Sequence, residues 1–211
     1  MNIRFVLVCE GTSDEGLVPH LQFLCVECGA SEAIGVAADF SRLPISPGRS
    51  LASRLNAAKA LEPSANLLFV HRDADSRVET ARLSEISQAT GGTGVQTVPV
   101  IPIQETEAWL LLDEDAIRSV VENPEGTVPL VLPRPQNVER VADPKTRLKK
   151  ALALASELRG RRLRKLKKDF PRYRKLLLQR LDTRGPLAQV PAWQRLVNRT
   201  EAAVRTVAGA Y

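Results

Sequence analysis

The sequence predicts an α/β fold built on a mostly parallel β-sheet that is flanked by helices. Two apolar runs, residues 3–9 and 66–72, have the length and composition of strands buried on both faces. Helical spacing follows each run, and strands that alternate with helices are typical of parallel sheets. The charge distribution adds a C-terminal basic segment, for which helices are expected.

The expected elements follow in chain order. The first strand (3–9) leads into a helix that Ser13 caps and that ends near Cys28. The sheet region continues with a short strand near 34–40, a helix near 49–61, the strand at 66–72, a helix near 76–89, a strand over 95–103 and a helix from Glu107 to Val121. Helices are then expected at 145–158, 161–181 and 191–208.

These elements divide the chain into three parts. Residues 1–122 form the α/β domain, residues 123–144 form a proline-rich connection, and residues 145–211 form the basic helical segment. Residues 145–180 hold 15 Lys or Arg against Glu157 and Asp169, a net charge of +13. The remainder is then −7 in a chain whose net charge is +6. An acidic body joined to a basic arm indicates a polyanionic partner.

The composition favours a soluble protein over a membrane protein. No stretch approaches the roughly 20 apolar residues that a membrane span needs. The apolar N-terminal run is followed at once by acidic residues, which favours a buried strand over a signal peptide, so a cytoplasmic location is expected. Cys9, Cys25, Cys28 and His20 could nominally supply four zinc ligands. Only one close-spaced cysteine pair is present, however, so buried thiols are the favoured interpretation of the cysteines.

Acidic residues follow the two apolar strands. Glu10 and Asp14 come after the first strand, and Asp73 and Asp75 come after the second. Because ligands of open parallel sheets bind outside the carboxyl ends of the strands, we expect these carboxylates to converge. Converging carboxylates repel unless a cation lies among them, and hard oxygen ligands select Mg²⁺ or Mn²⁺. The alternative is that each is a helix cap or a solvated loop residue.

The sequence around these residues resembles the TOPRIM fold, which topoisomerases, bacterial primases and OLD-type nucleases share. The resemblance rests on Val-Cys-Glu10-Gly-Thr-Ser-Asp14, on Phe-Val-His-Arg-Asp73-Ala-Asp75 and on Glu105-Thr-Glu107-Ala-Trp-Leu-Leu-Leu-Asp113. The last pattern is similar to that of stand-alone bacterial TOPRIM proteins and of OLD-type enzymes. The likeness covers residues 1 to about 121, and the tail matches more loosely.

The resemblance implies roles for particular residues. Metal would be held by Glu10, Asp14, Asp73, Asp75 and either Glu105 or Glu107, of which Glu107 is the chosen candidate. OLD-type nucleases add a late lysine near the scissile phosphate, for which Lys145 is the candidate; its alternative is an ordinary solvated cation. Glu10, Asp73, Asp75 and Lys145 thus form the expected catalytic set.

Two departures argue against a topoisomerase. Cys9 stands where a glycine often precedes the glutamate, and neither Tyr173 nor Tyr211 lies in a domain suited to a nucleophilic tyrosine. His71 could orient a carboxylate, although core packing is the favoured interpretation.

The basic segment is expected to bind nucleic acid. Its cations would contact phosphates without sequence choice, while Phe170 and Tyr173 could stack on bases. A solvated helix face and a membrane-surface helix are the alternatives. The expected contact residues are Arg161, Arg162, Arg164, Lys165, Lys167, Lys168, Arg172, Arg174 and Lys175.

These observations favour a Mg²⁺- or Mn²⁺-dependent endonuclease acting on DNA or RNA. The resemblance implies a role in phage defence or nucleic-acid maintenance, often with a separately encoded ATPase. This sequence itself has no ATPase motif. The first alternative is a non-catalytic nucleic-acid-binding or regulatory subunit that retains the fold. The second is RNA processing of the 5S ribosomal RNA maturase kind, with the same site and a different substrate.

Overall fold

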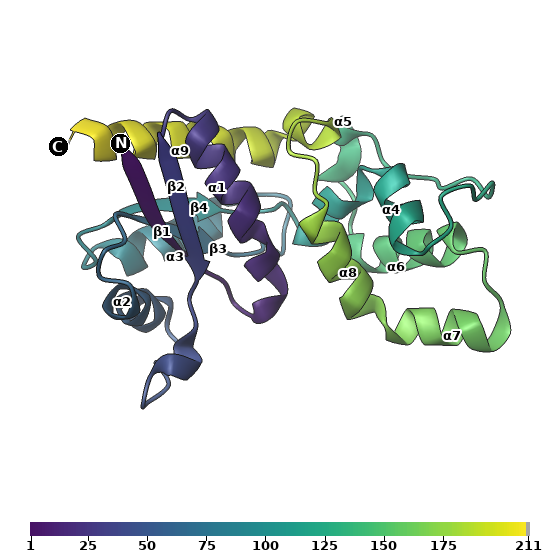
Figure 1. The fold of residues 1–211 in the computed structure, drawn as a ribbon, viewed down its shortest axis with the longest axis horizontal. Helices are drawn as coiled ribbons and strands as arrows, with labels where there is room; N and C mark the ends of the chain where they lie inside the picture. The colour runs from purple at the N-terminus through teal and green to yellow at the C-terminus, as the bar shows by residue number, and fades with distance from the viewer. Residues whose placement is uncertain (210–211) are drawn as a thin grey trace. The chain divides into compact units, whose positions relative to one another are not determined.

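The computed structural model describes residues 1–209, and the chain divides into two compact units (Figure 1). The first, called here the sheet unit, contains residues 1–72, 78–101 and the chain from Gln194 onward. The second, called the helical unit, contains residues 73–77 and 102–193. The C-terminal segment that the sequence predicts to be helical, 145–211, therefore contributes to both units.

Four parallel strands form the sheet, in the order β2-β1-β3-β4. The strands are β1 (Asn2–Val8), β2 (Glu32–Ala37), β3 (Leu67–His71) and β4 (Gln96–Val100). The central strands β1 and β3 are the two apolar runs, and all five residues of β3 are buried. An α/β fold with a parallel sheet flanked by helices is thereby confirmed.

Helices pack against this sheet within the sheet unit (Figure 1). α1 packs on β2, α2 packs on β1 and α3 packs on β4. The helices are α1 (Val18–Glu27), α2 (Leu51–Leu61), α3 (Thr80–Thr90) and the part of α9 (Pro191–Gly209) from Gln194 onward, with 3₁₀ helices η1 (Thr12–Leu17) and η2 (Phe40–Arg42).

The first helix differs from its prediction, because Ser13 does not cap it. The 3₁₀ helix η1 precedes α1, its N-cap is Gly11, and no side chain caps it. Pro19 lies in the first turn of α1, where its missing N–H costs no hydrogen bond, so the α-helix begins at Val18. Ser13 Oγ instead donates a hydrogen bond to Asp14 Oδ2 at 2.8 Å.

The helical unit contains shorter helices than the sequence predicts. Its elements are η3 (Thr106–Leu111), α4 (Glu114–Val120), α5 (Pro135–Val138), α6 (Pro144–Ala155), α7 (Gly160–Lys168), α8 (Phe170–Gln179) and η4 (Pro186–Gln189). The helix predicted from Glu107 to Val121 is broken where Asp113 accepts a hydrogen bond from Ala116 N at 2.8 Å and caps α4. The helix predicted over 161–181 is broken at Asp169, before Pro171.

Each unit has its own aromatic core. In the sheet unit, Phe5 and Phe69 meet edge to face with ring centroids 4.9 Å apart. Gly35 lies against the Phe5 ring, where a Cβ would come within 2.0 Å of a ring carbon. In the helical unit, Trp109 and Trp193 meet edge to face at 5.3 Å. None of the helices within residues 1–209 is both long and apolar enough to span a membrane.

Candidate functional site

The carboxyl ends of β1 and β3 define the candidate site of the sheet unit. The two strands are parallel neighbours, with Val8 in register with Val70. The chain leaves β1 toward β2 and leaves β3 toward β4, in opposite directions along the sheet. Such a reversal is a topological switch point, where open α/β sheets bind their ligands. Glu10 and Asp14 follow one strand at this point, and Arg72 and Asp73 follow the other in the chain.

Glu10 is paired with an arginine at this edge. Its carboxylate forms an ion pair with Arg72 Nη1, and the side chain of Glu10 is 48% exposed. The same guanidinium contacts Glu85 of α3 at 2.6 Å through Nη2. Arg72 therefore holds two carboxylates at once, and its position one residue after β3 brings it beside the end of β1.

Asp14 is the buried acid of this edge. It lies in η1, accepts a hydrogen bond from Ser13 Oγ, and has His71 Nε2 at 4.0 Å from its Oδ1. His71 is itself buried at the end of β3. The favoured interpretation of His71 as a core residue agrees with its burial, and Asp14 supplies a carboxylate beside it.

Arg54 supports the segment that carries Glu10. This residue of α2 donates hydrogen bonds to the backbone oxygen of Cys9 at 2.6 Å and to that of Glu10 at 3.2 Å. A pocket of about 300 Å³ opens here between residues 9–12 and 37–41. The sequence carries no motif for Arg54, because its role depends on where α2 packs.

Asp73 and Asp75 belong to a short segment of the helical unit. Ala74 N donates to Pro102 O at 3.0 Å, Asp75 N donates to Gln104 O at 3.0 Å, and Gln104 N donates to Ser76 O at 3.1 Å. Asp75 and Gln104 have φ of +52° and +62°, in the left-handed region that costs most side chains energy. The backbone around the Asp-x-Asp motif is therefore paired and locally strained.

Asp73 is oriented by the chain that follows β4. Its Oδ1 accepts hydrogen bonds from Thr106 N at 2.9 Å and from Thr106 Oγ1 at 3.1 Å. Thr106 begins η3, the element that also carries Glu107. The Asp-x-Asp motif and the Glu-x-Glu motif, about 30 residues apart in the chain, thus adjoin each other in the helical unit.

Glu107 is buried and paired with two cations. Arg174 Nε of α8 donates a hydrogen bond to Glu107 Oε1 at 3.0 Å, and Lys145 Nζ lies 4.0 Å from the same oxygen. The side chains of Glu107 and Arg174 are 4% and 8% exposed. Burial, together with the Glu107 carboxylate, raises the pKa of the neighbouring Glu105, which accepts a hydrogen bond from Lys145 N at 3.3 Å.

Two predictions about the basic segment are wrong, one for Arg174 and one for Phe170. Arg174 is expected to contact nucleic acid, but it is buried against Glu107 and is not presented to a polyanion. Phe170 is expected to stack on bases, but it is buried with Lys149 Nζ 5.0 Å from its ring centroid. Both residues lie on α8, where the helix faces the core of its unit.

Four of the predicted metal ligands therefore each contact a different group of the protein. Glu10 pairs with Arg72, Asp14 adjoins His71, Asp73 binds Thr106, and Glu107 pairs with Arg174. Within residues 1–209, no group of three or more His, Cys, Asp or Glu side chains is placed to hold a metal ion. The carboxylates have the chemistry that Mg²⁺ prefers, and two of them, Glu10 and Glu107, form ion pairs with arginines.

Cys25 and Cys28 have thiols of low reactivity. Burial raises the pKa of Cys25 to about 12 and that of Cys28 to about 11. Cys28 Sγ also donates to Val197 O at 3.9 Å. Because the thiolate is both the nucleophile and the metal ligand, neither thiol is suited to these roles near neutral pH.

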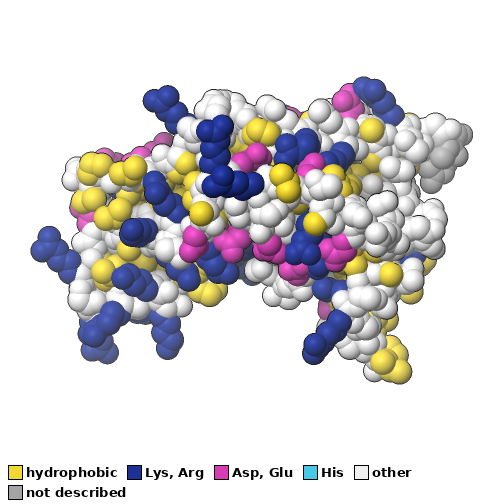
Figure 2. All heavy atoms as spheres, turned by 180° about the vertical axis from the view of Figure 1, so that it is seen from behind, with side chains coloured by type: hydrophobic (Ala, Val, Ile, Leu, Met, Phe, Trp, Pro, Cys, Tyr) yellow, Lys and Arg dark blue, Asp and Glu magenta, His cyan; other side chains and the backbone are white. Residues whose placement is uncertain are grey.

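The remaining predicted cations lie on an exposed surface of α7 and the start of α8. Figure 2 shows Lys and Arg side chains gathered over α7, at the lower left of that view. Eight of the nine predicted contact residues are exposed, namely Arg161, Arg162, Arg164, Lys165, Lys167, Lys168, Arg172 and Lys175. This set is called the α7 cation surface below.

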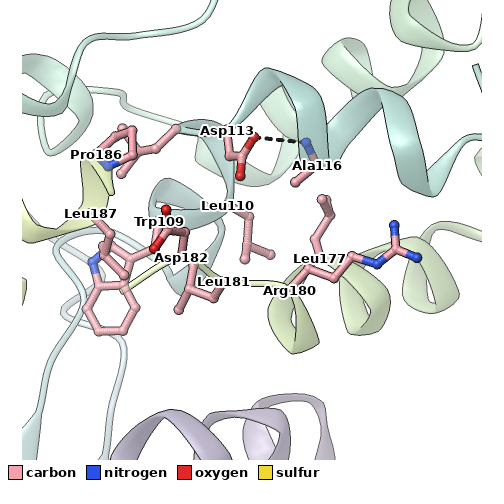
Figure 3. Close-up of a pocket in the computed structure, with 11 residues that line it drawn as sticks. Trp109, Leu110, Asp113, Ala116, Leu177, Arg180, Leu181, Asp182, Pro186 and Leu187 are labelled. Atoms are coloured by element: carbon pink, nitrogen blue, oxygen red, sulfur yellow. Dashed lines mark hydrogen bonds between the residues drawn. The ribbon is translucent and has the colours of Figure 1, made fainter. Parts of the chain in front are cut away.

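The helical unit also contains a small cavity (Figure 3). It has a volume of about 20 Å³ and lies among Trp109, Leu110, Leu177, Leu181 and Leu187. That volume holds about one water molecule, so the cavity is a packing feature and not a substrate pocket.

Comparison with known proteins adds no relative: no family model, no curated protein and no solved structure matches the chain.

Proposed function

We propose that the chain is a divalent-metal-dependent nuclease of the TOPRIM class that cleaves phosphodiester bonds in DNA or RNA. The observation that carries the proposal is the edge formed by β1 and β3. Glu10 and Asp14 follow β1, the Asp73-x-Asp75 motif follows β3, and these neighbouring strands flank the topological switch point of the sheet.

The proposed ligands are carboxylates from the segments that follow β1 and β3. Glu10, Asp14, Asp73 and Asp75 supply oxygen donors, and Glu107 is a further candidate. A bound Mg²⁺ or Mn²⁺ would polarise the phosphate and activate a water molecule. The chain's own residues orient these ligands: Thr106 fixes Asp73, Arg54 fixes the backbone of Glu10, and Ser13 and His71 adjoin Asp14.

Lys145 is the proposed cation beside the scissile phosphate. Its side chain is half exposed at the start of α6, and its Nζ lies 4.0 Å from Glu107. An exposed ammonium beside a buried acid is suited to meeting a phosphate, since its charge is incompletely satisfied. The α7 cation surface is proposed to hold the nucleic-acid backbone through phosphates and without sequence choice.

The test is cleavage of nucleic acids by the purified full-length chain. Plasmid DNA, single-stranded DNA and structured RNA are incubated with Mg²⁺ or Mn²⁺, and products are resolved on denaturing gels. We expect cutting by the wild type and its loss in E10Q, D73N and D75N. E125Q, an exposed glutamate of the helical unit outside the proposed ligand set, is the matched control and should cut like the wild type.

Binding separates this proposal from the non-catalytic alternative. The arginine pairs of Glu10 and Glu107 favour that alternative, since an arginine can replace an ion structurally. A wild-type chain that binds nucleic acid but never cuts it, with either metal, would establish a binding or regulatory subunit. Adding a candidate ATPase partner to the same assay tests whether cutting requires one.

A further inference from the structure

The loop between β2 and α2 is an unusual projection of the sheet unit. Beyond η2 it extends away from the carboxyl end of β2 (Figure 1). Its tip reads Pro44-Ile45-Ser46-Pro47. Ile45 is 82% exposed, the largest exposure among the large hydrophobic side chains of residues 1–209. In Figure 2 hydrophobic side chains form the end of this projection, at the lower right.

The two ends of the loop are fixed. Asp39 Oδ1 accepts hydrogen bonds from Ser41 N at 3.0 Å and Ser41 Oγ at 2.6 Å. At the other end, Ser50 Oγ accepts from Ser53 N at 3.2 Å and caps α2. The two prolines restrict the backbone on both sides of Ile45. An apolar tip held in this way loses little conformational freedom on binding, which is the condition for a preorganised contact.

The charged side chains within residues 40–61, which carry the tip, are all basic, and the acids Asp39 and Glu62 flank this stretch. Residues 40–61 contain no Asp or Glu and four basic residues, Arg42, Arg49, Arg54 and Lys59. Arg42 and Arg49 lie on either side of the tip and are exposed. Arg42 Nη1 forms an ion pair with Glu62 Oε1 at 2.6 Å. An apolar point with an exposed guanidinium group on each side, of which Arg42 pairs with Glu62 and Arg49 forms no ion pair with an acid of residues 1–209, complements a partner that combines anionic charge with an apolar interior.

The base of the loop adjoins the candidate site. The Arg54 guanidinium lies 5.1 Å from the centre of the Phe40 ring and also holds the backbone oxygens of Cys9 and Glu10. One arginine therefore contacts both the start of the projection and the segment that carries Glu10. A partner gripped by the tip would pass close to that segment.

We propose that Ile45 is a wedge that enters the base stack of a nucleic-acid duplex from its minor groove, with Arg42 and Arg49 on the flanking phosphates. Isoleucine and proline are among the side chains that minor-groove proteins insert between base steps. Inserting Ile45 removes its exposed surface from water and unstacks one step, which kinks the duplex. The inference rests on the proposed function and deepens it, because it assigns duplex nucleic acid as the substrate class.

The test measures unstacking without cleavage. Full-length protein in EDTA is titrated into a duplex of about 30 base pairs, longer than the roughly 16 base pairs that a typical double-stranded RNA-binding domain spans, with 2-aminopurine beside a central TA step. Binding is followed by anisotropy of an end label. DNA and RNA duplexes and a single strand form parallel arms. We expect the wild type to raise 2-aminopurine emission on a duplex, and I45S to lose that rise and to bind about 3- to 10-fold more weakly.

Three variants make the result specific. V131S removes another exposed apolar side chain, 74% exposed and in the helical unit, and should leave emission and affinity unchanged. I45L keeps a wedge and should restore the emission. R49A should weaken binding on every duplex and reduce its salt dependence by about one phosphate contact.

The outcomes distinguish the wedge from the proposed function. If the wild type binds duplexes without any rise in emission, or if I45S behaves like the wild type, the wedge is refuted while the nuclease proposal stands. If the chain binds no nucleic acid in any arm, both proposals fail. If Ile45 governs binding to vesicles containing anionic lipid but not to duplexes, the tip is a membrane contact and the wedge is refuted.

Discussion

Two carboxylate–arginine pairs, one in each unit, differ mainly in their access to water. Glu10 and Arg72 form an ion pair at the open edge of the sheet, and the side chain of Glu10 is 48% exposed. Glu107 and Arg174 form theirs in the interior of the helical unit, with both side chains under a tenth exposed. An exposed pair contributes little to stability, whereas breaking a buried pair leaves an uncompensated charge. Glu10 can therefore exchange its arginine for another cation at little cost, whereas the Glu107 pair is part of the core.

The largest expected effect comes from breaking the buried pair. R174A leaves the Glu107 carboxylate buried beside a lysine 4.0 Å away, and should lower the free energy of unfolding by about 3–5 kcal/mol. Urea unfolding followed by circular dichroism measures the loss. K175A removes an exposed cation next along α8 and should change stability by less than about 0.5 kcal/mol. Equal stability of R174A and K175A would contradict the comparison.

Changing Glu10 should affect cleavage more than it affects the free energy of unfolding. E10Q removes a proposed metal ligand and should lower cleavage by at least about 100-fold. Because the side chain of Glu10 is half exposed and Arg72 keeps its contact with Glu85, the same change should cost less than about 1 kcal/mol of unfolding free energy. Mn²⁺ titration by calorimetry supplies a readout that does not depend on activity. A large loss of stability in E10Q would place Glu10 in the same structural role as Glu107.

A smaller effect tests a helix cap in the helical unit. D113A removes the side chain that accepts a hydrogen bond from Ala116 N, and should destabilise the unit by about 1 kcal/mol. D115A, an acidic neighbour within the first turn of α4, is the control and should cost only a few tenths of a kcal/mol. Thermal unfolding of the three chains in one buffer gives the comparison; a cap that contributes nothing would leave D113A and D115A alike.

The smallest effect is a dependence of stability on pH. Hydrogen bonds from Val128 N and Thr127 N lower the pKa of Glu157 below its usual 4.5. A lowered pKa in the folded state means that this contribution is present above pH 4.5 and is lost as the pH falls through the folded-state pKa. Wild-type stability should therefore decline more between about pH 5 and pH 3 than that of E157Q. Parallel curves for the two proteins would show that Glu157 is not the group responsible.

The sequence predicts the sheet well and the helical unit less well. The strands β1 and β3 are continuous apolar runs, and Ser50 caps α2 beside the predicted start of that helix. Apolar periodicity, however, does not separate one long helix from two short ones. Asp113 and Asp169 each stand inside such a pattern, and only the local hydrogen bonds and the following proline decide where the helix ends.

At the candidate site, too, the sequence predicts what strand order determines but not the contacts that depend on how the helices pack. Strand order places Glu10 and Arg72 together, and a parallel sheet makes that proximity foreseeable. No sequence pattern distinguishes Arg174 from the exposed cations around it, because its burial depends on how α8 packs against η3. Arg54 is missed for the same reason: its hydrogen bonds go to backbone oxygens, which carry no sequence signature.

The left-handed backbone of Asp75 has a consequence for how this position can vary in evolution. At a φ of +52°, aspartate and asparagine are tolerated well and glycine is free of strain, while β-branched and bulky residues are disfavoured. Substitutions to Asn or Gly should therefore strain the backbone here less than substitutions to Val, Ile or Thr, whatever chemistry the acid performs. A homologue that has lost the acid but keeps this backbone is expected to carry asparagine or glycine here more often than a β-branched residue.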